Sequence, residues 1–184
     1  VRERSNAGID TISLSYSSET AFSMPRNIEN VILEMPIVVN GNAGDNVMMT
    51  TYYFSVSLHG RGGDDQLNGG REDSLYGGGG DDVLIGGTMR DLLVGGEGAD
   101  RFVWHDISDS TAEAPDTVVG FESGVDIIDF ASSDTGYYSW IGSAAFSGTA
   151  GELRANAHRI EGDRDGDGVA DLAILLKDGD NVQE

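Results

Sequence analysis

Three consecutive nonapeptides decide the fold of this chain: Gly77-Gly-Gly-Gly-Asp-Asp-Val-Leu-Ile, Gly86-Gly-Thr-Met-Arg-Asp-Leu-Leu-Val and Gly95-Gly-Glu-Gly-Ala-Asp-Arg-Phe-Val. Each unit starts with glycines, has an aspartate at its sixth place and a large apolar residue two places later. A single Gly-Asp cluster would indicate an ordinary turn, because both residues favour turns. Recurrence at a fixed period predicts instead a repeat architecture, in which each unit stacks on its neighbours.

The repeat extends back to residue 41, with one ten-residue unit, the degenerate stretch Thr50–His59, and one eight-residue unit. The sixth-place aspartates are Asp65, Asp82, Asp91 and Asp100, with Asp73 in the short unit. The apolar residues at the fixed offset are Met48, Leu58, Leu67, Leu75, Leu84, Leu93 and Phe102.

The physics of one unit predicts how the units assemble. Glycines at the first, second and fourth places are expected to adopt positive φ and turn the chain sharply. The three residues after each aspartate form a short strand, and only the middle one points inward. Two units make one coil, so the strands stack into two parallel sheets with the apolar residues between them. Turns of every second unit lie above one another, and their aspartates and free carbonyl groups form oxygen cages. Such hard oxygen ligands favour calcium.

These nonapeptides resemble the calcium-binding repeats of RTX proteins. The resemblance implies an all-β fold, a right-handed parallel β-roll with a C-terminal β-rich cap. Segments 8–14 and 27–33 look like the degenerate coils that precede such repeats. Segments 99–104, 110–118, 121–130 and 146–153 resemble the carboxy-terminal domain of serralysin-type secreted metalloproteases. We therefore expect leading coils over 1–40, a calcium-binding roll over 41–103 and a cap over 104–184.

Stacking predicts which residues share a cage. One side of the roll carries Asn46, Asp65, Asp82 and Asp100, and the other carries Asp73 and Asp91. The resemblance to serralysin-type rolls implies that Asp109 and Asp116 close the site above Asp91. Turn carbonyl groups are expected to complete the calcium shells, namely those of Gly60, Gly62, Gly63, Gly77, Gly78, Gly80, Gly95 and Gly96.

Departures from the pattern weaken particular cages. Asn46 stands where an aspartate is expected, which lowers the charge of the first cage. The degenerate stretch 50–59 contains no glycine and no aspartate, so no cage is expected below Asp73. Arg71 lies in the short unit and Met89 replaces a fourth-place glycine, so the cage between Asp73 and Asp91 is the weakest prediction.

A second acidic cluster follows in the expected cap, at Asp163, Asp165, Asp167 and Asp171. Its D-x-D-x-D-G core is that of an EF-hand-like loop, but the twelfth place is Ile174 and the bidentate glutamate is missing. Two interpretations remain open: a calcium loop, or a tight acidic hairpin before a strand at 172–176.

Composition excludes several classes of function. The 184 residues carry 32 acidic and 11 basic side chains, a net charge of −21, which repels nucleic acid and anionic membranes. Cysteine is absent and no apolar run could span a membrane. An apolar content of 39% argues against permanent disorder, so we expect a chain that folds only with metal. No HExxH or GxSxG motif occurs, which favours a non-catalytic part of a secreted enzyme.

The leading functional hypothesis is a module that stays unfolded in a low-calcium cytoplasm, passes through the type I secretion machinery and folds on calcium outside the cell. Neither the start at Val1 nor the end at Glu184 matches a signal, so we expect a fragment of a longer protein. The alternative is a polysaccharide-binding module, as similar modules of alginate-modifying enzymes suggest. It would use Arg61, Arg71, Arg90 and Arg101 on an anionic polysaccharide. Two interpretations apply to the aromatic residues Trp104, Trp140, Tyr137 and Tyr138. They form a sugar-stacking patch or, as we prefer because large aromatics dominate cores, the cap's core or its contact with the roll.

Overall fold

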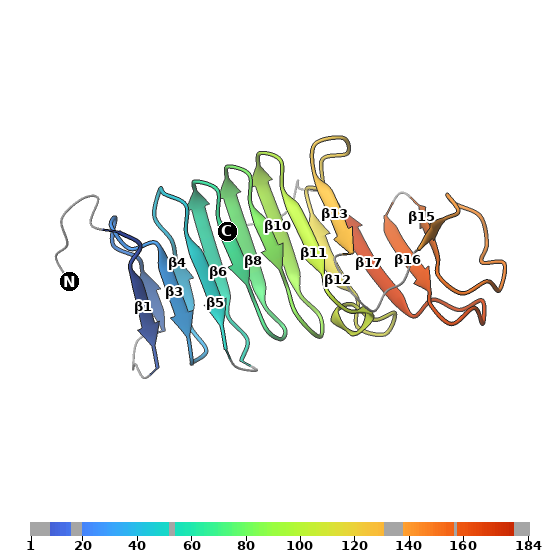
Figure 1. Ribbon diagram of the computed structural model, residues 1–184, viewed down its shortest axis with the longest axis horizontal. Helices are drawn as coiled ribbons and strands as arrows, with labels where there is room; N and C mark the ends of the chain where they lie inside the picture. The colour runs from blue at the N-terminus through green and yellow to red at the C-terminus, as the bar shows by residue number, and fades with distance from the viewer. Residues whose placement is uncertain (1–7, 16–19, 52–53, 131–137, 157, 179–184) are drawn as a thin grey trace.

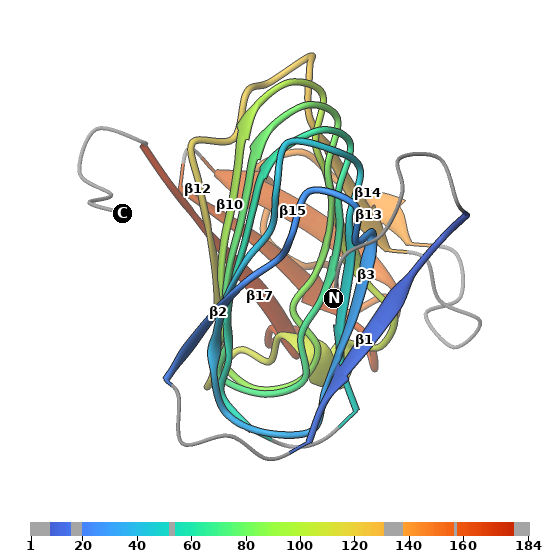
Figure 2. The same ribbon diagram turned by 90° about the vertical axis from the view of Figure 1, so that its left-hand side faces the viewer.

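The structure is a computed structural model that describes residues 8–15, 20–51, 54–130, 138–156 and 158–178. Two sheets face each other along one elongated body (Figure 1). Seen from the end of the body, successive coils lie almost directly behind one another (Figure 2). The prediction of an all-β parallel roll is confirmed. The sequence expectations for Tyr137 and for the two chain ends fall outside the described residues.

The first sheet is parallel throughout. Its strands, in spatial order, are β1 (Thr11–Leu14), β3 (Asn30–Leu33), β5 (Val47–Thr50), β7 (Gln66–Asn68), β9 (Val83–Ile85), β11 (Arg101–Trp104) and β13 (Ile127–Phe130).

The second sheet is parallel along the roll and ends in antiparallel strands in the cap. From the roll to the cap its strands are β2 (Ala21–Ser23), β4 (Val38–Asn40), β6 (Ser57–Gly62), β8 (Ser74–Gly79), β10 (Leu92–Glu97), β12 (Asp116–Val119), β17 (Leu172–Lys177), β16 (Arg159–Asp163), β15 (Glu152–Asn156) and β14 (Ser139–Trp140). Pairing is antiparallel between β15 and β16 and between β16 and β17. Both sheets run without a break across the predicted boundaries at residues 40 and 103, and the division into three parts stays a prediction.

The core is a double column of stacked apolar side chains between the sheets. In the first sheet, parallel register places Met48 beside Leu67 and Leu67 beside Leu84. In the second, Leu58 lies beside Leu75, which in turn lies beside Leu93. All seven apolar residues predicted to point inward have no exposed surface, which confirms the inward position. One such residue per strand gives a thin core, so the roll depends on what its turns contribute.

The second sheet departs from the prediction of three-residue strands. Its strands β6, β8 and β10 are six residues long and continue into the glycines of the next unit. Pairing continues there because glycine lets successive backbones approach closely: a Cβ at Gly78 would collide with the carbonyl of Arg61 below it. The first-place glycines also differ from expectation, since positive φ occurs at the second and fourth places, as in Gly78 and Gly80, and not at Gly77.

The aromatic residues divide between core and surface. Trp104 is 2% exposed and packs near Phe130, which in turn contacts Tyr138. Trp140 is 63% exposed. The only helix among the described residues is the 3₁₀ turn η1 (Ile107–Asp109), and none there is long and apolar enough to cross a membrane.

Candidate metal centre

Backbone hydrogen bonds connect the sixth-place residues that precede the strands of the first sheet. The amide of Asn46 donates to Asp65 Oδ1 at 2.7 Å, that of Asp65 to Asp82 Oδ1 at 2.8 Å, and that of Asp82 to Asp100 Oδ1 at 3.0 Å. The Asp100 amide continues the series to Asp126 Oδ1 at 3.1 Å. We call these five residues the first ladder. It brings together the four residues that the sequence predicted for this side.

A second ladder runs along the opposite edge of the roll. The amide of Val56 donates to Asp73 Oδ1 at 2.7 Å, that of Asp73 to Asp91 Oδ1 at 2.7 Å, and that of Asp91 to Asp116 Oδ1 at 2.8 Å. We call Asp73, Asp91 and Asp116 the second ladder. Asp73 differs from Asp91 because its Oδ2 accepts a hydrogen bond from the Gly70 amide. Both oxygens of Asp73 are therefore satisfied by the chain itself, on the side of the Asp73–Asp91 cage that was the weakest sequence prediction.

Two hydrogen bonds attach Asp116, the last residue of the second ladder, to its surroundings at the start of the cap. The indole Nε1 of Trp104 donates to Asp116 Oδ2 at 2.7 Å, and the Asp116 amide donates to Ser110 Oγ at 2.8 Å. Ser110 in turn donates to the carbonyl of Ala173 in β17. Asp109 lies in η1, where its Oδ2 accepts from the amides of His105 and Asp106. The end of the roll and the start of the cap are thus one hydrogen-bonded unit.

Four ladder carboxylates keep one oxygen that the protein leaves unsatisfied. Asp65, Asp82, Asp91 and Asp100 each bury Oδ2 with no hydrogen-bond partner, and none of these residues is more than 2% exposed. An unpartnered buried carboxylate oxygen is costly, because it has lost water and gained nothing in exchange. Repetition of the same unsatisfied atom in four units indicates a partner that is not part of the chain. A divalent cation such as calcium is one partner that would satisfy these oxygens, because calcium takes carboxylate and carbonyl oxygens as ligands.

The first-place glycines leave space beside these oxygens. A Cβ at Gly60 would collide with Asp65 Oδ2 and lie against the carbonyl oxygen of Gly77 in the next coil. The same holds at Gly77, where a Cβ would meet Asp82 Oδ2 and the Gly95 carbonyl. Glycine is needed here for space and not for turn conformation. Each cradle therefore brings a carboxylate oxygen and a carbonyl oxygen to one point, which suits an oxygen-ligated cation.

A second set of carbonyl oxygens lies in the turns. The carbonyls of Gly63, Gly78 and Gly80 each point at the positive-φ glycine of the next coil, where a Cβ would collide with them. Gly62 and Gly96 belong to the same turns, in register with Gly79 and Gly78. Of the carbonyl groups predicted as ligands, those of Gly60, Gly77 and Gly95 lie beside ladder side chains, and a role in binding stays a prediction for all of them.

The electrostatics of the ladders oppose a metal-free folded state. Burial raises the pKa of Asp65 and of Asp91 to about 7, that of Asp82 to about 6 and that of Asp116 to about 8. Loss of hydration is the largest cause, and the neighbouring ladder carboxylates add to it. Donation from backbone amides works in the opposite direction without cancelling the rise. The ladders are therefore costly to keep charged unless a cation neutralises them.

The acidic loop of the cap connects two antiparallel strands, β16 and β17. Oxygen atoms of Asp163, Asp165 and Asp171 lie within 4.8 Å of one another, whereas Asp167 stays outside this group and accepts from the Val169 amide. Asp163 is fully buried, but both its oxygens accept from backbone amides, those of Gly166 and Gly168. The loop is thus a hairpin that gathers three carboxylates. Calcium binding there stays a prediction.

Asp126 is the ladder residue that the sequence interpretation missed. Its signal was present, since Ile128 follows it at the same two-residue offset as in the repeats and pairs with Phe102 in the next strand. The glycine pattern before it is broken: Glu122 stands in the turn, and its amide donates to Asp126 Oδ2 at 2.8 Å. The offset between aspartate and apolar residue is therefore a better guide to the ladder than the glycines are.

A comparison with known families places this arrangement. The family described as Peptidase M10 serralysin C terminal matches residues 56–178, more than half of the chain. The chain belongs to this family. The match begins just before β6 and ends after β17, so it covers the roll from residue 56 onward, with all ladder residues except Asn46, together with the cap. No curated protein matches the chain.

Membership of the serralysin C-terminal family confirms the resemblance that the nonapeptides predicted. The family indicates a calcium-binding module of a secreted protein, which suits an extracellular location and the oxygen-lined cradles. The repeats of serralysin C-terminal domains bind calcium in general, and the unsatisfied ladder oxygens offer a place for it in this chain.

Proposed function

We propose that this chain is the calcium-dependent folding and type I secretion module of an extracellular bacterial protein and carries no catalysis of its own. The observation that carries the proposal is the set of four buried, unpartnered Oδ2 atoms on Asp65, Asp82, Asp91 and Asp100. Calcium in the cradles would be held by these oxygens together with turn carbonyls. It would supply the positive charge that the ladders lack.

Repulsion along the ladders keeps the chain unfolded where calcium is scarce. Neighbouring strands lie about 5 Å apart, and two like charges at ~5 Å and an effective dielectric constant of ~20 repel by about 3 kcal/mol. Several such pairs exceed the marginal stability of a thin core, which is of the order of 5–15 kcal/mol for a whole domain. An unfolded chain can thread the secretion channel in the cytoplasm.

Calcium outside the cell reverses the balance. Extracellular modules bind calcium with dissociation constants of about 10⁻⁴–10⁻³ M. Each occupied site then stabilises the folded state by mass action, by about 3 kcal/mol at a hundredfold excess over the dissociation constant. Folding on the outer side would also prevent return of the chain through the channel.

The substitution Asp82→Asn tests the proposal, and the same substitution at the neighbouring Asp81 is its control. Asp82 is buried in the first ladder, whereas Asp81 is exposed and its Oδ1 accepts from the Ala99 amide. The buried substitution should raise the midpoint of calcium-induced folding, measured by circular dichroism, by about tenfold or more, because a charged ligand is worth roughly 1.5–3 kcal/mol. In chelator the wild-type chain should lack strand signal.

Asp81→Asn removes the same charge and should leave the calcium midpoint within about twofold, because exposed charges interact weakly. The proposal fails if wild-type protein is equally folded and equally stable in calcium and in chelator. It also fails if the two substitutions shift the midpoint alike, since the effect would then come from net charge.

The four arginines named for a polysaccharide-binding stripe lie in different parts of the roll. The four arginines do not form one row: Arg61 is in register with Gly78 in the second sheet, and Arg71 bridges to Thr88 in the opposite turns. Arg101 forms an ion pair with Asp129, and Arg90 donates to the Glu113 carbonyl. A titration with anionic polysaccharide at fixed calcium would still detect such binding by its heat.

A further inference from the structure

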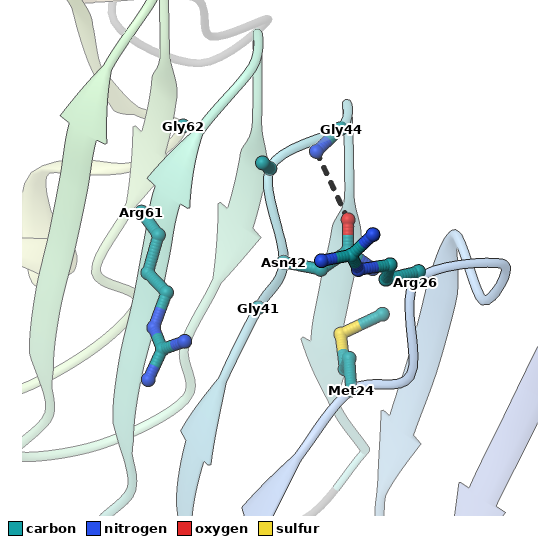
Figure 3. A pocket seen from close by; sticks show the side chains of 8 residues that line it. Met24, Arg26, Gly41, Asn42, Gly44, Arg61 and Gly62 are labelled. Atoms are coloured by element: carbon teal, nitrogen blue, oxygen red, sulfur yellow. Dashed lines mark hydrogen bonds between the residues drawn. The ribbon is translucent and has the colours of Figure 1, made fainter.

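An open pocket of about 670 Å³ lies beside the first coils of the roll, away from the cap. Its walls include Met24, Arg26, the backbone of residues 41–44 and Arg61. Figure 3 shows the two arginine side chains on either side of the 41–44 segment, with Met24 below Arg26. Asn42 fixes that segment, because its Oδ1 accepts from the Gly44 amide while its Nδ2 donates to the carbonyls of Pro25 and Ile28. The wall between the arginines is therefore held in place.

Arg61 occupies a position that the following coils reserve for glycine. It is in register with Gly78, which is in register with Gly96, and all three have positive φ: 83°, 119° and 118°. A Cβ at either glycine would collide with the carbonyl of the coil before it. At residue 61 the coil before it is the pocket wall, so a side chain fits. An arginine in this conformation is uncommon, because left-handed φ disfavours any residue with a Cβ.

The pocket is lined by two basic residues, although the chain as a whole is strongly acidic. Acidic residues outnumber basic ones by 32 to 11, yet the side chains of Arg26 and Arg61 make no ion pair or hydrogen bond among the described residues. By contrast, Arg101, Arg154 and Arg159 all form ion pairs. Two guanidinium groups without such partners line one pocket, and each fork can donate two parallel hydrogen bonds to an oxyanion.

Neighbouring groups limit the size and nature of such an anion. Exposed Asp45 and Asp64 lie in the adjoining turns, where Asp45 Oδ1 accepts from the Asp64 amide, and would repel a long polyanion. Met24, of which 5% is exposed, adds a small apolar area to the pocket lining that suits carbon atoms. These neighbours favour a compact organic molecule with one or two carboxylate groups over a long charged chain or an inorganic ion.

We propose that Arg26 and Arg61 bind the carboxylate of a compact organic anion in this pocket, with Met24 against its carbon skeleton. The site lies outside the two ladders and goes beyond the calcium-dependent function. It gives the first coils a binding role separate from folding.

Arg61→Gly tests this site without harming the roll. Glycine adopts positive φ without strain, so the variant should fold at the same calcium concentration and be at least as thermally stable as the wild type. Its affinity for carboxylates should fall about tenfold or more, the size of one charge-assisted contact. Arg26→Gln should weaken binding in the same way. Arg90→Gln, in a turn outside the pocket, should leave the affinity unchanged.

Four probes identify the chemistry at saturating, fixed calcium: glutarate, galacturonate, neutral galactose and sulfate. Backbone amide NMR signals of 41–44 and Gly62 should shift with glutarate or galacturonate and not with galactose or sulfate. A linear carboxylate that binds alone, or a sugar acid that binds alone, identifies which skeleton the pocket prefers. The proposal is overturned if neither carboxylate shifts these signals at millimolar concentration. It is equally overturned if sulfate binds as well as they do, or if binding survives in both pocket variants.

Discussion

At the scale of single residues, the calcium cradles depend on the missing side chains of first-place glycines. Gly77→Ala would place a Cβ against Asp82 Oδ2 and the Gly95 carbonyl, at the point where the cation is proposed to lie. We expect it to destabilise the calcium-bound roll by about 1–3 kcal/mol, the usual effect of overpacking, and to raise the calcium midpoint. Urea unfolding at saturating calcium, together with a calcium titration, measures both effects.

Gly79→Ala is the matched control two residues away. A Cβ at Gly79 meets nothing within 4 Å, and the residue does not have positive φ. Alanine should therefore be neutral or stabilise by up to about 1 kcal/mol, through lower freedom of the unfolded chain. Equal losses of stability in the two variants would show that glycine content, and not the cradle, determines stability.

At the scale of elements, the hydrogen bond from Trp104 in β11 to Asp116 in β12 joins the two sheets at the start of the cap. Trp104→Phe keeps an aromatic ring but leaves Asp116 Oδ2 buried without its donor. We expect a loss of about 1–3 kcal/mol, the cost of an unsatisfied buried acceptor, and a higher calcium requirement for cap folding. Near-ultraviolet circular dichroism during calcium titration follows the cap aromatics.

The second tryptophan provides the comparison for that variant. Trp140 in β14 is 63% exposed and has no such buried contact, so Trp140→Phe should leave stability within about 0.5 kcal/mol. It also leaves Trp104 as the only indole of the chain, a direct fluorescence reporter of the last ladder rung. If Trp104→Phe proves as harmless as Trp140→Phe, the hydrogen bond does not connect the ladder to the cap.

The elements also show where sequence reasoning succeeded. The parallel roll and its inward residues could be predicted because a nine-residue period forces every second turn into contact, whatever the details. The length of β8 could not, because it depends on how closely Gly77 and Gly78 let adjacent coils approach. The antiparallel hairpin of β16 and β17 was one of two interpretations that the sequence left open, because its acidic loop belongs to no repeat. Asp126 was not predicted because the glycine pattern before it is broken, although Ile128 follows it at the two-residue offset of the repeats.

At the scale of the whole molecule, protons and calcium compete for the same buried carboxylates. Burial raises the folded-state pKa of Asp65 and Asp91 to about 7 from 3.8. Between these two values the metal-free folded state holds protons on the two carboxyl groups, whereas the unfolded chain has released them. The stability that the metal-free folded state gains from these bound protons is complete below about pH 3.8. It is lost as the pH rises through about 6 to 8, the folded-state pKa values of Asp82 and Asp116.

The metal-free chain should therefore gain strand structure on acidification, with circular dichroism in chelator showing more of it at pH 5 than at pH 8. Calcium affinity should change in the opposite direction with pH, because binding requires deprotonated carboxylates, and it should fall from pH 8 to pH 5. Binding at pH 5, where the folded metal-free chain holds protons on these carboxyl groups, should release protons into a weak buffer. Asp82→Asn should reduce that release, and Asp81→Asn should not. A metal-free chain equally unfolded at pH 5 and pH 8, with calcium affinity independent of pH, would mean that the ladder carboxylates stay hydrated and that their repulsion does not control folding.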